Sequence, residues 1–305
     1  MRETVKDRYE VIEKIGQGGM GVTFVAYDKF NGVNCAIKRL PETFDNLRPK
    51  FLEEVTLSTS FDHSNLVHAY DSGEWNGQPF MVMELWNNSA DSSSFKLDEV
   101  VRLSQDIAEG CGELHKSGIL HRDIKPANVL VDKHLYALSD LGLAIPIDKQ
   151  TRSFKGDPIH GTPQYMSPEQ SHGWILAPTS DIYNLGMTMY HLRFGGPLVQ
   201  GGSVSEVLNK QRHHDFKLPI MNDQHDSRYV HIIEKCTALR PKDRYQSMEE
   251  LRKDLISLGK DLAQPKHGCL VSGVHMLWRG VMYLPNKRKN YKLVSMTTTS
   301  MPCHG

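Results

Sequence analysis

The sequence has few cysteines, and their arrangement argues against the simplest cysteine-based scaffolds. Five are scattered along the 305 residues, and no pair has the C-x-x-C spacing. The odd count and the scatter argue against a disulfide framework or a zinc site, and they favour a reducing compartment. The cysteines are Cys35, Cys111, Cys236, Cys269 and Cys303.

Long apolar runs and an excess of one charge are also absent. No apolar run approaches about 18 residues, so we expect no transmembrane segment. The charged stretch 1–10 has no apolar centre of a signal peptide, and we therefore expect a cytoplasmic location. Lys+Arg and Asp+Glu both number 36, so whole-chain charge does not indicate nucleic acid as a partner, and we expect none.

The charge is nevertheless unevenly distributed. Residues 265–305 contain six Lys or Arg and no Asp or Glu, which leaves a net charge of −6 on residues 1–264. The simpler interpretation of this basic extension is a loosely packed segment. A second interpretation, based on the basic cluster at 287–292, is contact with an acidic partner or an anionic membrane surface.

The first part of the chain has the pattern of β-strands. Residues 9–69 contain β-branched and aromatic runs, with a strong hairpin signal at Asn31-Gly32. One helix is expected within this part, over residues 48–61, and a further strand over 79–85. The polar stretch 87–94 is expected to be a loop.

The pattern becomes helical after about residue 97. Apolar residues recur there at helical spacing, which predicts one buried face: Val100, Leu103, Ile107, Cys111 and Leu114. Long helices are also expected over 181–192 and 248–262. We therefore expect an α+β protein with two lobes. The expected parts are an N-terminal extension at 1–8, a small β-rich lobe at about 9–85, a larger helical lobe at about 86–262 and a basic extension at 263–305.

The most informative segment is residues 121–128, with the sequence His-Arg-Asp-Ile-Lys-Pro-Ala-Asn. Short apolar runs flank it on both sides and predict two buried strands that hold a tight loop. The loop carries a carboxylate at Asp123, an ammonium at Lys125 and a carboxamide at Asn128. Phosphoryl transfer uses such groups as a base for the attacking hydroxyl, a cation for the moving phosphate and an oxygen ligand for a metal.

This segment has the H-R-D-x-K-x-x-N pattern, and the chain resembles the eukaryotic-type protein kinases over residues 9–262. The resemblance implies a two-lobed kinase fold that uses ATP and Mg²⁺, with Mn²⁺ as an alternative. It implies that Asp123 is the catalytic base, that Lys125 neutralises charge on the γ-phosphoryl group and that Asn128 holds the metal. Within the family, the motifs of this chain most resemble those of bacterial Ser/Thr kinases, whose substrates are Ser or Thr residues of proteins.

A glycine-rich segment lies between two expected strands at residues 16–21. Alone, its G-x-G-x-x-G pattern also fits a hairpin turn or a dinucleotide site, but a dinucleotide site requires a helix directly afterwards. The kinase resemblance places it over ATP. Thr23 stands where the family has Val, and we expect ATP binding to survive this change. The implied ATP-binding residues here are Ile15, Gly16, Gln17, Gly18, Gly19, Met20, Gly21, Val22, Thr23 and Ala36.

The resemblance also assigns the remaining groups around the nucleotide. Lys38 is expected to hold the α- and β-phosphates and to pair with a glutamate on the next helix. Glu53 and Glu54 are both candidates, and the spacing to the His63-Ser64-Asn65 turn favours Glu54. The expected adenine contacts are Met83, Glu84 and Leu85.

Residues 140–142, Asp-Leu-Gly, occupy the place of the family's D-F-G motif. The resemblance implies that Asp140 holds Mg²⁺ together with Asn128. Leu141 replaces the usual Phe, which keeps apolar packing but removes the aromatic ring.

Residues 161–169 resemble the end of the kinase activation segment. The resemblance implies that Thr162 contacts Asp123 and Lys125, and that Glu169 pairs with Arg244. It also implies that residues 121–128 are the catalytic loop and that Asp181 braces this loop through its backbone. Arg122 is expected to bind a phosphate on this segment. Thr151 and Ser153 are the candidate phosphorylation sites.

Two rival functions fit the same fold. A pseudokinase or scaffold would keep the fold without the chemistry, but Lys38, Asp123 and Asp140 are all present. A small-molecule kinase is the second rival. The segment 161–169 and Arg244 argue against it, because in the family they build a platform for protein substrates.

Overall fold

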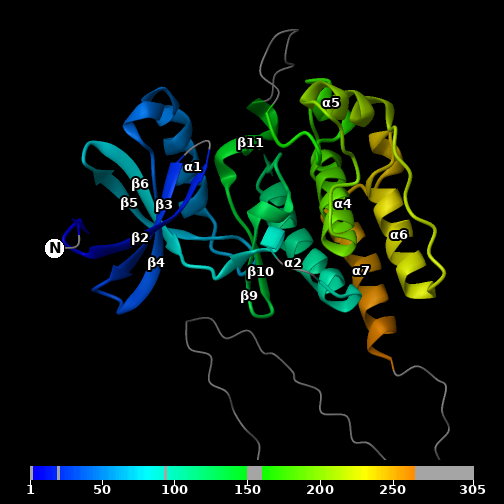
Figure 1. Ribbon diagram of the computed structural model, residues 1–305, viewed down its shortest axis with the longest axis horizontal. Helices are drawn as coiled ribbons and strands as arrows, with labels where there is room; N and C mark the ends of the chain where they lie inside the picture. The colour runs from blue at the N-terminus through cyan, green and yellow to red at the C-terminus, as the bar shows by residue number, and fades with distance from the viewer. Residues whose placement is uncertain (1–2, 19–20, 93–94, 150–159, 265–305) are drawn as a thin grey trace, which may run out of the picture. The chain divides into compact units, whose positions relative to one another are not determined.

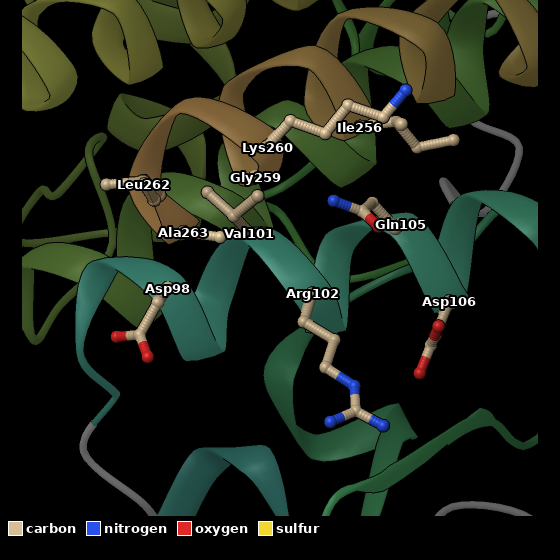
Figure 2. Close-up of a pocket in the computed structure, with 10 residues that line it drawn as sticks. All are labelled: Asp98, Val101, Arg102, Gln105, Asp106, Ile256, Gly259, Lys260, Leu262 and Ala263. Atoms are coloured by element: carbon tan, nitrogen blue, oxygen red, sulfur yellow. The ribbon is translucent and has the colours of Figure 1, made fainter. Parts of the chain in front are cut away.

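A computed structural model describes residues 3–18, 21–92, 95–149 and 160–264. Its first part is a six-stranded antiparallel sheet with the order β1-β2-β3-β4-β6-β5, drawn in blue and cyan in Figure 1. Its strands are β1 (Thr4–Val5), β2 (Tyr9–Gly18), β3 (Gly21–Asp28), β4 (Val33–Arg39), β5 (Ala69–Trp75) and β6 (Gln78–Glu84). The 3₁₀ helix η1 (Glu42–Leu47) and the helix α1 (Arg48–Ser60) follow β4.

The alternation of side chains along the sheet explains where α1 packs. Ile37 and Val82 belong to one apolar cluster of the sheet, whereas Met81 belongs to a second cluster with Phe51 and Val55 of α1. Because successive side chains of a strand point to opposite faces, the face that carries Met81 is the face covered by α1.

The second part is mainly helical (Figure 1). Its helices of four or more residues are α2 (Leu97–Lys116), α3 (Pro168–Ser171), α4 (Pro178–Phe194), α5 (Val204–His213), α6 (Gln224–Cys236) and α7 (Met248–Ala263). Helix α2 packs against α7 and α4, and α6 packs against both α4 and α7. All five residues of the predicted apolar face of α2, Val100 to Leu114, are buried in this core.

Short elements complete the second part, and several lie beside the catalytic loop. The strands form a three-stranded sheet, β10-β9-β7, and a two-stranded one, β11-β8. They are β7 (Asn88–Ser89), β8 (Ile119–Leu120), β9 (Val129–Asp132), β10 (Leu135–Leu138) and β11 (Ile145–Pro146). The 3₁₀ helices are η2 (Ala90–Ser92), η3 (Pro126–Asn128), η4 (Leu141–Leu143), η5 (Ile147–Lys149) and η6 (Pro241–Asp243).

The predicted α+β, two-lobed fold is confirmed, with one local correction. The polar sequence of 87–94 predicts a loop, but Asn88 and Ser89 pair with Val131 and Leu130 of β9. A two-residue strand is too short to produce the alternation by which strands are recognised. The segment before Tyr9 also contributes to the main sheet, because Val5 pairs with Tyr9.

None of the helices among the described residues is both long and apolar enough to cross a membrane.

A buried carboxylate at Asp28 fixes the end of the β3–β4 hairpin. Its oxygens accept hydrogen bonds from Arg8 Nε at 2.8 Å and Arg8 Nη2 at 2.7 Å. The backbone N–H groups of Phe30 and Asn31 donate to the same carboxylate. The bond from Arg8 is the main reason that the pKa of Asp28 falls from 3.8 to about 2. Gly32, at φ +68°, then completes the predicted turn.

We predict that Asp28→Asn lowers the free energy of unfolding by about 2 kcal/mol at pH 6, because the lost interactions correspond to the depressed pKa. The carboxylate stabilises the fold fully above pH 4–5, and this contribution is lost as the pH falls through about 2. Urea unfolding should therefore show that the difference in unfolding free energy between Asp28→Asn and the wild type is about 1 kcal/mol smaller at pH 3 than at pH 6. The exposed Asp62→Asn is the control. A difference that is equal at both pH values would contradict the assignment.

Candidate active site

The side chain of Asp181, in the first turn of α4, binds the backbone of the catalytic loop. Asp181 Oδ2 accepts the backbone N–H of His121 at 2.9 Å, and Oδ1 accepts that of Arg122 at 2.8 Å. His115 Nε2, from α2, lies 2.8 Å from Oδ2. Burial opposes ionisation of Asp181, but the bond from His115 and the backbone donors keep its pKa below the ordinary value. The carboxylate thus fixes the loop by its backbone.

This bracing matters because the loop has a strained backbone. Arg122 has a φ of +72°, in the left-handed region that non-glycine residues rarely adopt. Its N–H is bound by Asp181, and its carbonyl accepts Gln170 Nε2 at 2.6 Å. Contacts on both sides of the residue hold a conformation that the chain would otherwise avoid.

The Asp123 side chain is buried and lies at the centre of a hydrogen-bond cluster. Its Oδ2 is 2.7 Å from Lys125 Nζ and accepts from Asn128 Nδ2 at 3.2 Å. Its Oδ1 accepts the N–H and the hydroxyl of Thr162, both at 2.9 Å. Lys125 Nζ also donates to Thr162 Oγ1 at 2.8 Å. A fixed carboxylate and a fixed ammonium therefore lie side by side.

The lysine of β4 lies in a second charged cluster. Lys38 pairs with Met81, so it points to the face of the sheet that α1 covers. Its Nζ lies 2.5 Å from Glu54 Oε1 and 3.1 Å from Asp140 Oδ1. Glu54 is buried, whereas Glu53 is exposed. The structure thus brings Glu54 to the lysine and leaves Glu53 in solvent.

The electrostatics of this cluster favour a charged lysine. Burial alone would lower the pKa of Lys38, but the carboxylates of Glu54 and Asp140 raise it above the ordinary value. Burial raises the pKa of Glu54, with Asp140 adding to the effect and Lys38 opposing it. Burial also acts to raise the pKa of Asp140, but the charge of Lys38 keeps it lowered. The charge of Lys38 thus stabilises the ionised form of Asp140.

Two oxygen donors of this site suit a hard divalent cation. Asn128 commits its Nδ2 to the backbone and side chain of Asp123, so its Oδ1 is the atom that can bind a metal. The Asp140 side chain keeps 36% of its surface exposed and has a left-handed backbone, with φ +65°. Carboxylate and amide oxygens are the ligands that Mg²⁺ prefers, so these residues fit the ion that the sequence predicts.

The glycine-rich segment is the turn between β2 and β3. A Cβ atom at Gly21 would lie 3.1 Å from the carbonyl oxygen of Arg39, a tight contact, so the close approach of β3 to β4 favours glycine there. Gly16 and Gly18 have open space around their Cα atoms. Gly19 and Met20 lie outside the described residues, and Gln17 accepts a hydrogen bond from Lys14.

The other predicted nucleotide contacts surround this turn or lie on neighbouring strands. Thr23 is paired with Lys38, and Ala36 with Met83. Ile15 is about half exposed. The partly buried Val22 belongs to β3, and Glu84 ends β6 directly before Leu85.

The segment 161–169 is anchored to the helical core by a buried ion pair. Arg244 Nη1 lies 2.7 Å from Glu169 Oε1, and Arg244 Nη2 lies 3.0 Å from Oε2. The Arg244 side chain is fully buried. Ser180 adds a hydrogen bond to Glu169 at 2.7 Å. Burial opposes ionisation of Glu169, but the bond from Arg244 keeps its pKa lowered.

A group of basic side chains beside the loop was only partly foreseen from the sequence. Burial lowers the pKa of Arg122, and its Nε is buried with no hydrogen-bond partner among the described residues. Burial and then the charge of Arg122 lower the pKa of Lys50. Burial, Lys50 and Arg122 lower the pKa of His160. Lys50 lies on α1 one helical turn before Glu54, on the side of the helix that faces the site. This spacing could have identified Lys50 as a member of the basic group from the sequence. The candidates Thr151 and Ser153 lie outside the described residues.

We predict that Glu169→Ala lowers the free energy of unfolding by about 3–5 kcal/mol, because it leaves the buried guanidinium of Arg244 unpaired. Lys253→Ala is the matched control, since its pair with Glu249 is 3.8 Å long and exposed. That change should cost less than about 1 kcal/mol. Urea denaturation of both variants measures these changes. Equal decreases in the free energy of unfolding would show that the buried Glu169–Arg244 pair stabilises the fold no more than an exposed pair does.

The sequence is similar to those of known proteins over most of its length. PknB of Corynebacterium glutamicum, a probable serine/threonine-protein kinase, is 31% identical over 281 residues, covering 86% of this chain and 44% of that protein. The serine/threonine-protein kinase PrkC of Bacillus subtilis is 29% identical over 265 residues, covering 82% and 40%. The chain spans less than half the length of these relatives. The family model described as the protein kinase domain matches residues 9–256, and the chain therefore belongs to the protein kinase family.

Proposed function

We propose that this chain transfers the γ-phosphoryl group of ATP to Ser or Thr hydroxyls of protein substrates. The observation that carries the proposal is the contact between Asp123, Lys125 and Thr162, which holds a carboxylate and an ammonium in one fixed position. The relatives named above are described as serine/threonine-protein kinases, which supports the choice of acceptor.

In this proposal Asp123 orients the acceptor hydroxyl and takes its proton. Lys125, 2.7 Å from that carboxylate, faces the transferred phosphoryl group and neutralises its charge. Lys38, kept charged by Glu54 and Asp140, binds the α- and β-phosphates. The turn at 16–21, with Ile15, Val22, Thr23 and Ala36, covers the nucleotide, and residues 83–85 contact the adenine.

Asn128 and Asp140 are the proposed metal ligands. Mg²⁺, or Mn²⁺ in its place, would neutralise phosphate charge when bound there. An amide oxygen and an ionised carboxylate are suitable ligands for either ion, so the donors do not select between the two.

Protein substrates, rather than small molecules, are supported by the anchoring of residues 161–169. Gln170 and Thr162 tie this segment to the catalytic loop, and Glu169 ties it to Arg244 in the core. The segment is therefore a rigid surface beside Asp123, as a polypeptide substrate requires. A pseudokinase would not need Lys38, Asp123 and Asp140 to keep these contacts.

Phosphorylation of Thr151 or Ser153 is the proposed control of activity. Burial lowers the pKa of the three basic groups Arg122, Lys50 and His160, and the charge of Arg122 further lowers the pKa values of Lys50 and His160. Among the described residues no carboxylate within 4.0 Å forms an ion pair with Arg122, Lys50 or His160. A phosphate group would supply the missing negative charge.

For the basic extension, contact with an acidic partner or an anionic membrane surface stays a proposal that rests on its composition alone. The domain limits 9–262, and the separation of residues 1–8 and 263–305 from them, are likewise proposals.

We predict that Asp123→Asn lowers the rate of phosphate transfer by about 10³-fold, because the base is removed while the shape of the side chain is kept. Transfer of radiolabelled phosphate from ATP to a generic Ser/Thr protein substrate measures the rate. Asp132→Asn, a nearby surface change, is the control. Wild-type protein that transfers no phosphate with Mg²⁺ or Mn²⁺ would instead favour the pseudokinase.

A pair of neighbouring glutamates on α1 allows a second test. Glu54→Gln should lower kcat/KM for ATP at least about tenfold, since it weakens the partner of Lys38. Glu53→Gln should behave as the wild type, because Glu53 is exposed. Steady-state kinetics at varied ATP decide, and equal effects of the two changes would refute the assigned pairing.

The double change Thr151→Ala/Ser153→Ala should reduce activity to that of phosphatase-treated wild type, because no phosphate can then reach the basic group at Arg122. Phosphate content by mass spectrometry and initial rates check this. Full activity in the double variant would remove both residues from the scheme.

A further inference from the structure

Three side chains of types that can bind metal ions converge beside the catalytic loop. Cys111 and His115 lie one turn apart on α2, and Asp181 faces them from α4. Cys111 Sγ is 3.4 Å from His115 Nε2 and 4.0 Å from Asp181 Oδ2, and Nε2 is 2.8 Å from Oδ2. Cys111 is fully buried, and the side chains of His115 and Asp181 are 8% and 1% exposed.

These separations allow one zinc ion to reach all three ligand atoms. The circle through the three atoms has a radius of about 2.0 Å, so one ion can lie about 2.0–2.3 Å from all of them without any of them moving. Zinc binds a Cys sulfur at about 2.3 Å, a His nitrogen at about 2.0–2.1 Å and a carboxylate oxygen at about 2.0–2.2 Å. Such an ion would lie slightly outside the plane of its ligands, with a fourth position open.

The charges also balance when an ion is bound. One thiolate and one carboxylate give the ligand set a charge of −2, which a divalent cation neutralises, as burial requires. The S–H bond of Cys111 breaks and its proton leaves to solvent. The ring of His115 stays neutral and carries its proton on Nδ1. That nitrogen is buried and has no hydrogen-bond partner among the described residues, so it can take the proton, while the ion replaces the hydrogen bond between Nε2 and Asp181.

We propose that Cys111, His115 and Asp181 form a binding site for Zn²⁺ or a similar borderline-soft divalent cation. Thiolate and imidazole are ligands that select zinc over magnesium. The site is therefore chemically distinct from the pair of oxygen donors at Asn128 and Asp140. It does not depend on the proposed kinase activity. The sequence contains no C-x-x-C pair, and the third ligand is 66 residues from His115, so only the fold brings the donors together.

The bound ion would link α2 to α4 directly. It would replace the hydrogen bond between His115 and Asp181, while Asp181 Oδ1 keeps the N–H of Arg122 and the second lone pair of Oδ2 keeps that of His121. Binding to the folded state alone raises its stability by mass action. Zinc should therefore raise the melting temperature of the chain.

Cobalt(II) is the most direct probe, because a bound thiolate gives it an intense charge-transfer band and tetrahedral coordination gives it strong visible bands. The experiment uses the full chain with Cys269→Ser and Cys303→Ser, loaded with Co²⁺ during expression and by dialysis, with excess Mg²⁺ present. We expect one equivalent of Co²⁺ with a thiolate band that Zn²⁺ displaces. Cys111→Ser should lose the band, and Cys236→Ala, at an equally buried cysteine, should keep it.

Two results would overturn the proposal. One is the absence of bound Co²⁺ after both loading procedures, and the other is a thiolate band that persists in Cys111→Ser. Circular dichroism confirms the folding of each variant. If Cys111→Ser does not fold, His115→Gln replaces it, and this change should weaken Co²⁺ binding at least tenfold. Unchanged binding would refute the site.

Discussion

The interaction on which the active site depends most is the bond between the buried carboxylate of Asp181 and the backbone of the catalytic loop. Burying an ionised carboxylate costs several kcal/mol unless donors surround it. Here two backbone N–H groups and His115 supply those donors. Because the bonds go to the main chain, they fix the loop whatever side chains it carries. They also hold Arg122 in its left-handed conformation, and the next residue, Asp123, contacts Lys125 and Thr162.

Two charged clusters lie around the catalytic loop, one in each part of the fold. Asp123, Lys125 and Thr162 belong to the helical part, and Gln170 and the Glu169–Arg244 pair secure the segment that carries Thr162. Lys38 and Glu54 belong to the sheet and α1. They meet the helical part at Asp140, 3.1 Å from Lys38 Nζ. The ends of the proposed reaction, a hydroxyl to be deprotonated and a phosphate to be held, are thus assigned to separate rigid supports.

The sequence predicted the parts of this arrangement that depend on local pattern. The catalytic loop, the glycine turn and the apolar face of α2 are short-range features, and the spacing to the His63-Ser64-Asn65 turn was enough to favour Glu54 over Glu53. It could not reveal features that need the fold. His115 gives no local sign that it faces Asp181, and Cys111 resembled an ordinary core residue. The two-residue strand β7 is too short to show the alternation of a strand. The basic group at Arg122 includes Lys50, which lies 72 positions earlier in the chain.

The most direct test of the account is the kinetics of Asp181→Asn. The change keeps the shape of the side chain but places an amide, which is a donor on one side, against two backbone donors. The account predicts a fall in kcat of about 10²-fold or more, with KM for ATP changed little because the Lys38 cluster does not contact Asp181. Far-UV circular dichroism should be that of the wild type. A folded Asp181→Asn protein with wild-type kcat would contradict the claim that this carboxylate holds the catalytic loop in place.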